Sequence, residues 1–359
     1  MDKIKIIVVD DSAFMRKAIS EMIESEKNFE VIAKLRDGRE LIEKVDEYTP
    51  DLITLDLHMK DLDGLATLKE LKKSGKSYPI IMLSSATTEG SELTLECLDN
   101  GAISFITKPS GSISLDIEKV QKNLIEEIKS ITSSIKSRRI LSVPNTRTRN
   151  TNSIMERSIN EENTSFNLKN KKIDAVVIGA STGGPKALQE VLTKLPSNLG
   201  VPVLVVQHMP EGFTKVFAER LNKICNMKVV EAEEGMVINK DTIYIAKGGH
   251  HMTVYTNSTI HLNEEPPIWG VRPAVDKLFD SAIKLYKSNL LSVILTGMGK
   301  DGASGTAHVK DYGGVTISED KSTCTIYGMP KAAFETGKVD LVVPLDQMAS
   351  KIINIVKGL

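Results

Sequence analysis

The sequence predicts an α/β protein with two doubly wound parallel sheets, one after the other along the chain. Short β-branched apolar runs alternate with amphipathic segments in residues 1–137 and again in residues 171–359. Residues 138–170 between them follow neither a strand nor a helix period. The length of 359 residues also exceeds what a single ordinary core accommodates. We therefore expect two domains and a linker.

Composition narrows the class of protein. Apolar residues make up 41% and charged residues 26% of the chain, and the net charge is −1, which is typical of soluble globular domains and gives no basic field for nucleic acid. Cys97, Cys225 and Cys324 lie too far apart for a disulfide framework, which favours a reducing compartment. The first apolar run reaches Asp10 too early for a signal peptide, and no run is long enough to span a bilayer. We expect a cytoplasmic protein without nucleic-acid partners or membrane insertion.

The first domain alternates strand and helix five times. We expect strands at Lys5–Val9, Phe29–Ala33, Leu52–Leu55, Ile80–Leu83 and Ile103–Ile106, and helices at Ala13–Ser25, Gly38–Glu47, Leu65–Lys73, Ser91–Asn100 and from Ile117. Five such units in this length predict a flavodoxin-like domain with a five-stranded parallel sheet.

Acidic side chains close two of these strands. Asp10 and Asp11 end the first strand and Asp56 ends the third, so three carboxylates meet at one edge of the sheet. Like charges this close repel each other, and Mg²⁺ is a usual relief. Ser84 and Lys108, after the fourth and fifth strands, are placed to hold a transferred phosphoryl group. A single acidic strand end is usually a solvated loop, but four strand ends with complementary groups favour a phosphoryl-transfer site.

These residues, with the loop Met59–Gly64, Phe105 and the dipeptide Lys108-Pro109, resemble the receiver domain of two-component response regulators. The resemblance implies that Asp56 accepts a phosphoryl group from a histidine kinase. It implies Asp11, Asp56 and the backbone carbonyl of His58 as Mg²⁺ ligands beside Asp10, with Ser84 and Lys108 on the phosphoryl oxygens and Phe105 as an aromatic that changes rotamer. Lys60 departs from the family, in which proline often follows the methionine of that loop.

Residues 138–170 are rich in Ser, Thr, Asn, Arg, Lys and Glu, and most of their apolar residues are isolated. Such a segment cannot bury enough surface to offset its chain entropy. We expect a flexible tether without chemistry of its own.

The second domain repeats the alternation and adds a hairpin at His250–Leu262. We expect strands at Ala175–Ile178, Val203–Val206, Lys228–Val230, Ile243–Ile245, Val293–Leu295, Val315–Ile317 and Leu341–Val343, and helices at Pro185–Leu195, Pro273–Tyr286 and Ala303–Asp311. The result is a doubly wound sheet with an antiparallel insertion.

Three strands of this sheet end just before a serine, a histidine and an aspartate: Ser181, His208 and Asp301. Carboxyl ends of parallel strands share one edge, so these side chains can meet in one crevice. Imidazole activates a serine hydroxyl, and a carboxylate orients the imidazole. Taken singly, Ser181 fits a capped turn or a phosphate-binding loop, and Asp301 fits a cap of the helix Ala303–Asp311. Together they predict a catalytic triad, without the Gly-x-Ser-x-Gly elbow of common α/β-hydrolases.

The segments Gly179–Gly184, Gln207–Met209, Arg272–Asp276 and Thr296–Gly302, behind a receiver, resemble the chemotaxis response regulator protein-glutamate methylesterases, the CheB family. The resemblance implies hydrolysis of glutamate γ-methyl esters on methyl-accepting chemoreceptors, with release of methanol, and in some members deamidation of receptor glutamines. Ser181 would attack the ester, His208 would carry the proton and Asp301 would orient His208. Backbone N–H groups near Thr182 and Met298 would hold the oxyanion, Arg272 would line the site, and this half would need no cofactor.

Three other functions remain open at this point. The chain could be a receiver-controlled binding module in which the loop Gly179–Pro185 holds phosphate or a nucleotide without hydrolysis. It could be a transcription regulator, although nothing after residue 170 gives a compact helix-turn-helix or a basic stripe. It could also hydrolyse a different protein ester.

Overall fold

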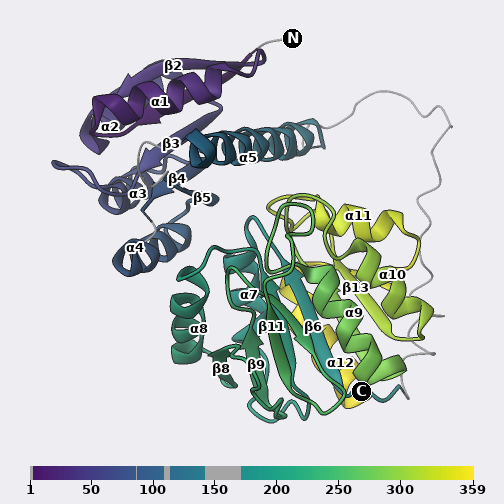
Figure 1. The fold of residues 1–359 in the computed structure, drawn as a ribbon. Coiled ribbons are helices and arrows are strands. Elements are labelled where there is room, and N and C mark those ends of the chain that lie inside the picture. The colour runs from purple at the N-terminus through teal and green to yellow at the C-terminus, as the bar shows by residue number, and fades with distance from the viewer. Residues whose placement is uncertain (1–2, 86, 109–113, 142–170) are drawn as a thin grey trace, which may run out of the picture. The chain divides into compact units, whose positions relative to one another are not determined.

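The computed structural model describes residues 3–85, 87–108, 114–141 and 171–359, shown in Figure 1. The chain divides into two compact units, Met1–Ser133 and Ser134–Leu359. Most of the expected tether, residues 138–170, lies outside the described residues, so its flexibility stays a prediction. Among the described helices, none has both the length and the apolar character that a membrane span requires.

The first unit holds a five-stranded parallel sheet in the order β2-β1-β3-β4-β5, which confirms the predicted receiver fold. Its strands are β1 (Ile4–Val9), β2 (Phe29–Leu35), β3 (Leu52–Asp56), β4 (Ile80–Ser84) and β5 (Ser104–Thr107). Its helices are α1 (Ala13–Glu24), α2 (Gly38–Tyr48), α3 (Gly64–Lys73), α4 (Thr88–Asp99) and α5 (Ser114–Leu141).

Two helices of this unit, α1 and α4, begin at side-chain caps that lie shortly after strand ends with predicted site residues. Ser12, next to Asp11, accepts a hydrogen bond from the backbone N–H of Met15 and starts α1. The Thr87 side chain accepts one from Gly90, so α4 begins at Thr88 and not at Ser91 as predicted. The prediction was wrong here because the apolar period starts later than the cap.

The second unit holds a seven-stranded parallel sheet in the order β14-β13-β12-β6-β7-β9-β8, with an antiparallel pair of β10 and β11. The strands are β6 (Ala175–Ala180), β7 (Val203–Gln207), β8 (Lys228–Glu231), β9 (Thr242–Ile245), β10 (His251–Val254), β11 (Ile260–Asn263), β12 (Leu290–Ile294), β13 (Val315–Glu319) and β14 (Leu341–Val343). The helices are α7 (Gly184–Leu192), α8 (Phe213–Ile224), α9 (Val275–Tyr286), α10 (Ala303–Asp311), α11 (Met329–Glu335) and α12 (Leu345–Lys357). The predicted doubly wound sheet and its hairpin are confirmed.

The sheet starts at its centre. Its first strand, β6, lies between β12 and β7, so the chain builds outward first on one side and then on the other. In open α/β sheets the ligand crevice forms where the strand order reverses, beyond the carboxyl ends of the strands. Ser181, His208 and Asp301 follow these three adjoining strands.

Helix α9 supplies much of the core beside these strands. Leu278, Phe279 and Ala282 are fully buried and belong to one cluster with Val177 of β6 and Ile294 of β12. Because this buried apolar surface holds α9 in place, it also fixes the position of the amino terminus of the helix. That terminus lies at the edge of the sheet where the carboxyl ends of the strands meet.

We expect Phe279→Ala to lower the free energy of unfolding of this unit by about 3–5 kcal/mol, because removing a buried phenyl ring leaves a cavity. The single tryptophan, Trp269, belongs to the same unit, so its fluorescence during urea denaturation measures the change. Phe334→Ala, at a ring that is 42% exposed, is the control and should cost far less. Equal costs for the two variants would contradict the assigned core.

Candidate functional site

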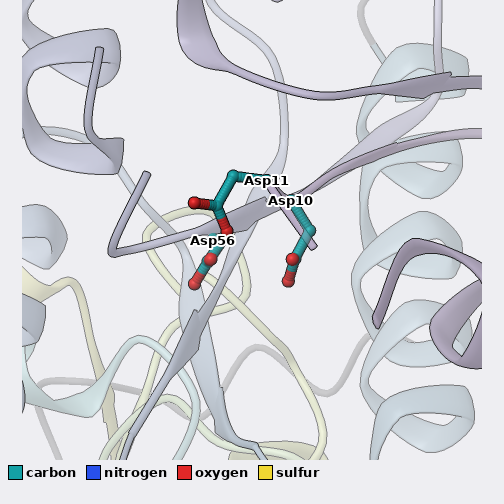
Figure 2. Close-up of side chains that lie close together, drawn as sticks. All are labelled: Asp10, Asp11 and Asp56. Atoms are coloured by element: carbon teal, nitrogen blue, oxygen red, sulfur yellow. The ribbon is translucent and has the colours of Figure 1, made fainter. Parts of the chain in front are cut away.

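Three carboxylates gather at the carboxyl edge of the first sheet. Figure 2 shows the side chains of Asp10, Asp11 and Asp56 close together. Each contributes one oxygen, and these oxygens lie within 4.8 Å of one another. Asp10 and Asp56 are buried, whereas Asp11 is exposed. The Lys108 ammonium lies 2.7 Å from an oxygen of Asp10 and 2.7 Å from one of Asp56. The structure thus brings together four of the residues that the sequence assigns to this site.

The charges at this edge do not balance. Burial raises the pKa of Asp56 even though Lys108 favours its ionised form. Burial also opposes the charge on Lys108, but hydrogen bonds to Asp10 and Asp56 hold its pKa above the usual range. One lysine faces three acids, and the donor set consists of hard oxygens with an exposed member at its opening, Asp11. These residues fit a hydrated divalent cation such as Mg²⁺.

The remaining predicted members of this site make other contacts. The backbone N–H of His58 points to Asp56 Oδ1 at 3.4 Å, which ties the following loop to the acid. Ser84 is fully buried, and its hydroxyl accepts a hydrogen bond from Thr94 Oγ1 at 2.7 Å and lies 3.3 Å from the carbonyl of Gly90. To contact a phosphoryl group, this hydroxyl would have to leave the backbone of α4.

In the second unit, the sheet register places Ser181 beside His208. Ala180 and Gln207 are partners on β6 and β7, and the His208 N–H donates to the Ala180 carbonyl at 3.1 Å. The next residue on each strand therefore leaves the sheet about 5 Å from its neighbour. Within the described ranges no hydrogen bond joins the Ser181 hydroxyl to His208, so proton transfer requires a side-chain rotation first.

His208 and Asp301 are joined directly. The Nε2 atom of His208 lies 2.8 Å from Asp301 Oδ2, and the aspartate is 2% exposed. The same carboxylate accepts hydrogen bonds from the backbone N–H groups of Val275 at 2.6 Å and Asp276 at 3.0 Å. Burial opposes ionisation of Asp301, but His208 and these N–H groups hold its pKa below the usual range. An ionised carboxylate only accepts, so Nε2 carries the proton and Nδ1 of the neutral ring is the free base.

This arrangement corrects the alternative role considered for Asp301. It caps the amino terminus of α9 through Val275 and Asp276, and not the helix that follows it in sequence. The N-cap of α10 is Gly302, with φ +87°, and it has no side-chain cap. The sequence could not show this because α9 is 25 residues from the aspartate along the chain.

The loop after β12 packs against Ser181. The Ser181 N–H donates to the Thr296 carbonyl at 3.0 Å, and Thr296 Oγ1 donates to the Thr182 carbonyl at 3.0 Å. A Cβ at Gly297 would lie 2.7 Å from the Cβ of Ser181, so only glycine permits this approach. The loop therefore lies against Ser181 and Thr182 at Thr296 and Gly297, the two residues before Met298.

The Arg272 side chain binds the chain segment that follows β11. Its guanidinium donates to the carbonyls of Glu264 at 2.7 Å and Glu265 at 3.2 Å. These two bonds hold the positive charge of Arg272 on the segment that follows β11. Among the hydrogen bonds of the described residues, none joins Arg272 to Ser181 or His208.

Sequence reasoning missed Asp276 as a member of the site. Its carboxylate accepts from the Gly305 N–H at 2.7 Å and from Trp269 Nε1 at 3.4 Å, while its backbone N–H donates to Asp301. Burial, followed by the charge of Asp301, raises the pKa of Asp276 to about 6. Asp276 lay within a motif quoted above, but an acid in the first turn of a helix is commonplace and gave no separate signal. The sequence gave no signal for Trp269 either. Its ring lies 3.9 Å from the Lys300 ammonium.

A five-stranded receiver sheet with an acidic edge, followed by a parallel sheet with a serine beside a histidine–aspartate pair, defines a class: response regulators with a hydrolase-type effector domain. Comparison with known proteins gives the family. The family model for the response regulator receiver domain matches residues 6–118, and the one for CheB methylesterase matches residues 176–352. The chain belongs to the CheB methylesterase family, as the resemblance in its motifs implied.

Relatives of similar length support this assignment. A protein of Clostridium acetobutylicum named protein-glutamate methylesterase/protein-glutamine glutaminase is 51% identical over 100% of this chain and 99% of its own length. A protein of the same name from Halalkalibacterium halodurans is 43% identical over 98% of each chain. The crystal structure of the Thermotoga maritima CheB methylesterase catalytic domain is 45% identical, covers 52% of this chain and all of that domain, and has a TM-score of 0.50.

We expect Asp276→Asn to become more stabilising as the pH rises. A carboxyl group whose pKa is raised to about 6 keeps its proton in the folded protein but loses it near pH 4 when unfolded, so it costs stability as the pH rises from 4 to 6. Asparagine carries no such cost, and the difference between variant and wild type should grow by about 1–2 kcal/mol across that range and then level off. Urea denaturation followed by circular dichroism measures it. Asp346→Asn on the exposed first turn of α12 is the control, and a pH-independent difference for Asp276→Asn would contradict the prediction.

Proposed function

We propose that this protein is a phosphorylation-regulated protein-glutamate methylesterase that hydrolyses glutamate γ-methyl esters on chemoreceptors and releases methanol. The observation that carries the proposal is the His208–Asp301 pair, at 2.8 Å, beside Ser181 on the neighbouring strand end. Relatives that share the full length of this chain bear the name of this activity and of protein-glutamine glutaminase. We extend the proposal to deamidation of receptor glutamines, since an amide undergoes the same acyl transfer.

The geometry supports a triad mechanism. The Ser181 hydroxyl attacks the ester carbonyl while His208 Nδ1 takes its proton, and Asp301 stabilises the resulting imidazolium through Nε2. The tetrahedral intermediate collapses, the C–O bond to the methoxy group breaks, and His208 returns the proton so that methanol leaves. A water molecule then attacks the acyl group on Ser181 by the same steps, which releases the glutamate carboxylate and restores the hydroxyl.

The oxyanion is assigned to the backbone N–H groups of Thr182 and Met298. The support is the hydrogen-bonded contact of their two loops through Thr296, whose own N–H donates to the buried Glu319 at 2.7 Å. Donors held in place before the reaction stabilise the developing charge without reorganisation. Arg272 is assigned to the substrate side, where its fixed positive charge would favour acidic receptor segments.

In the receiver, Asp56 is the proposed phosphoryl acceptor, and the kinase of the chemotaxis system is the proposed donor. Asp10, Asp11, Asp56 and the backbone carbonyl of His58 would hold Mg²⁺, which when bound neutralises the negative charge of the acids and the phosphoryl group. Lys108 lies 2.7 Å from Asp56 and can move from that carboxylate to a phosphoryl oxygen. Ser84 would contact a second oxygen after breaking its contacts with α4.

Ser181→Ala should lower methanol release from methyl-labelled chemoreceptor membranes by at least about 10³-fold, because no other group supplies the attacking oxygen. Ser350→Ala, at an exposed serine of α12, is the control and should retain full activity. Retained turnover in Ser181→Ala would contradict the hydrolase and favour a binding module in which Gly179–Pro185 holds phosphate.

Asp56→Asn should abolish the stimulation of methanol release by a small phosphoryl donor such as acetyl phosphate with Mg²⁺, while unstimulated release persists. The amide cannot accept the phosphoryl group, and Ser181, His208 and Asp301 are unaltered. The wild type and Asp46→Asn, at an exposed acid of α2, should both be stimulated. Stimulation of Asp56→Asn would show that the phosphoryl group acts elsewhere.

A further inference from the structure

We propose that Gln207 is a positioning residue that fixes the nucleophile and the base relative to each other, an inference that rests on the proposed function. Gln207 is the last residue of β7, and its side chain is 2% exposed. Its Nε2 atom donates to the carbonyl of Ser181 at 2.9 Å and to the carbonyl of His208 at 3.2 Å. One amide group therefore binds the backbone of both residues.

The chemistry of the two acceptors determines the orientation of this amide. A carbonyl oxygen only accepts hydrogen bonds, and a side-chain amide has two N–H bonds on one atom. Both N–H bonds are used, one for each carbonyl. The reversed amide would place a third oxygen against two others, so the bridge is the arrangement that this site permits.

The other end of the amide carries a cost in stability. Among the described residues, Gln207 Oε1 is buried without a hydrogen-bond partner. It lies against the first turn of α7, where a Cβ at Gly184 would come within 2.0 Å of it. The positive end of the α7 dipole offsets part of the cost of the unpaired oxygen. A methionine of similar size would avoid that cost but would lose both hydrogen bonds to the carbonyls, so the bridge is what the amide contributes here.

The bridge lies where the sheet no longer holds the two strands together. The register of β6 and β7 ends at Ala180 and Gln207, and the His208 N–H donates to the Ala180 carbonyl just beyond it, before the two chains continue into α7 and α8. Proton transfer requires about 3 Å between the hydroxyl oxygen of Ser181 and Nδ1 of His208. A displacement of either group by about 1 Å can lower the rate about 10²-fold. The amide of Gln207 limits this separation because it binds the backbone carbonyls of both residues.

Gln207→Met tests the bridge on the full-length protein, with methanol release from methyl-labelled receptor membranes as the assay. We expect kcat to fall about 10- to 100-fold, with KM within about twofold of the wild type. The midpoint of urea unfolding should change little, because loss of the two hydrogen bonds and removal of the unpaired oxygen have opposite effects. Gln347→Met, the same substitution at an exposed residue of α12, is the matched control and should leave kcat unchanged.

Gln207→Glu supplies a second readout that a structural role would not give. An ionised carboxylate repels both carbonyls, whereas the protonated acid donates one hydrogen bond. The ratio of variant to wild-type kcat should therefore rise as the pH falls, even if Gln207→Met folds poorly.

These experiments distinguish failure of the Gln207 bridge from failure of the proposed hydrolase function. If Ser181→Ala abolishes turnover but Gln207→Met keeps kcat within twofold, the bridge is overturned and the hydrolase stands. A pH-independent ratio for Gln207→Glu overturns the bridge as well. If Ser181→Ala retains turnover, the proposed function itself fails.

Discussion

The arrangement of the second unit depends on the hydrogen bonds that the buried carboxylate of Asp301 accepts. Asp301, at 2% exposure, accepts hydrogen bonds from His208 and from the backbone N–H groups of Val275 and Asp276. An unpaired charge there would be very costly. The same three bonds join the end of β12 to the start of α9 and to the residue after β7. The fold and the proposed site thus share their hydrogen bonds, and the imidazole is oriented by contacts that the packed core also requires.

Close backbone approach is the second constraint at this edge. A Cβ at Gly179 would lie 2.5 Å from Val275, one at Gly297 would lie 2.7 Å from Ser181, and one at Gly184 would collide with Gln207. None of these three positions has a positive φ angle, so the backbone conformation does not require glycine there. Gly183, in the turn beside them, does have a positive φ angle. Glycine is required for space. The small residues around Ser181 therefore reflect the packing of three loops, which the sequence alone presented as a turn.

The sequence predicted what depends on local periodicity and on the shared edge of parallel strands. Both sheets and the hairpin followed from periodicity, and the grouping of Asp10, Asp56 and Lys108 followed from the strand ends. The contacts that it missed join residues far apart in the chain. Asp276 reaches Gly305, Ser84 is bound by Thr94 of the next helix, and Gln207 contacts a residue 26 positions earlier. No period or motif records which of two nearby helices a carboxylate caps, because tertiary packing decides it.

The two units treat buried acids differently, and the difference matches their proposed roles. Burial opposes ionisation of Asp301, but its hydrogen bonds from the His208 imidazole and two backbone N–H groups hold its pKa below the usual range and favour the charged form. Asp56 is paired with a lysine side chain that also serves Asp10, and burial raises its pKa. A fixed carboxylate suits a residue that must orient His208 in every catalytic cycle. A carboxylate whose partner is shared suits the proposed phosphoryl acceptor, because a phosphoryl group on Asp56 would change which oxygen Lys108 binds and would so give two arrangements that differ in energy.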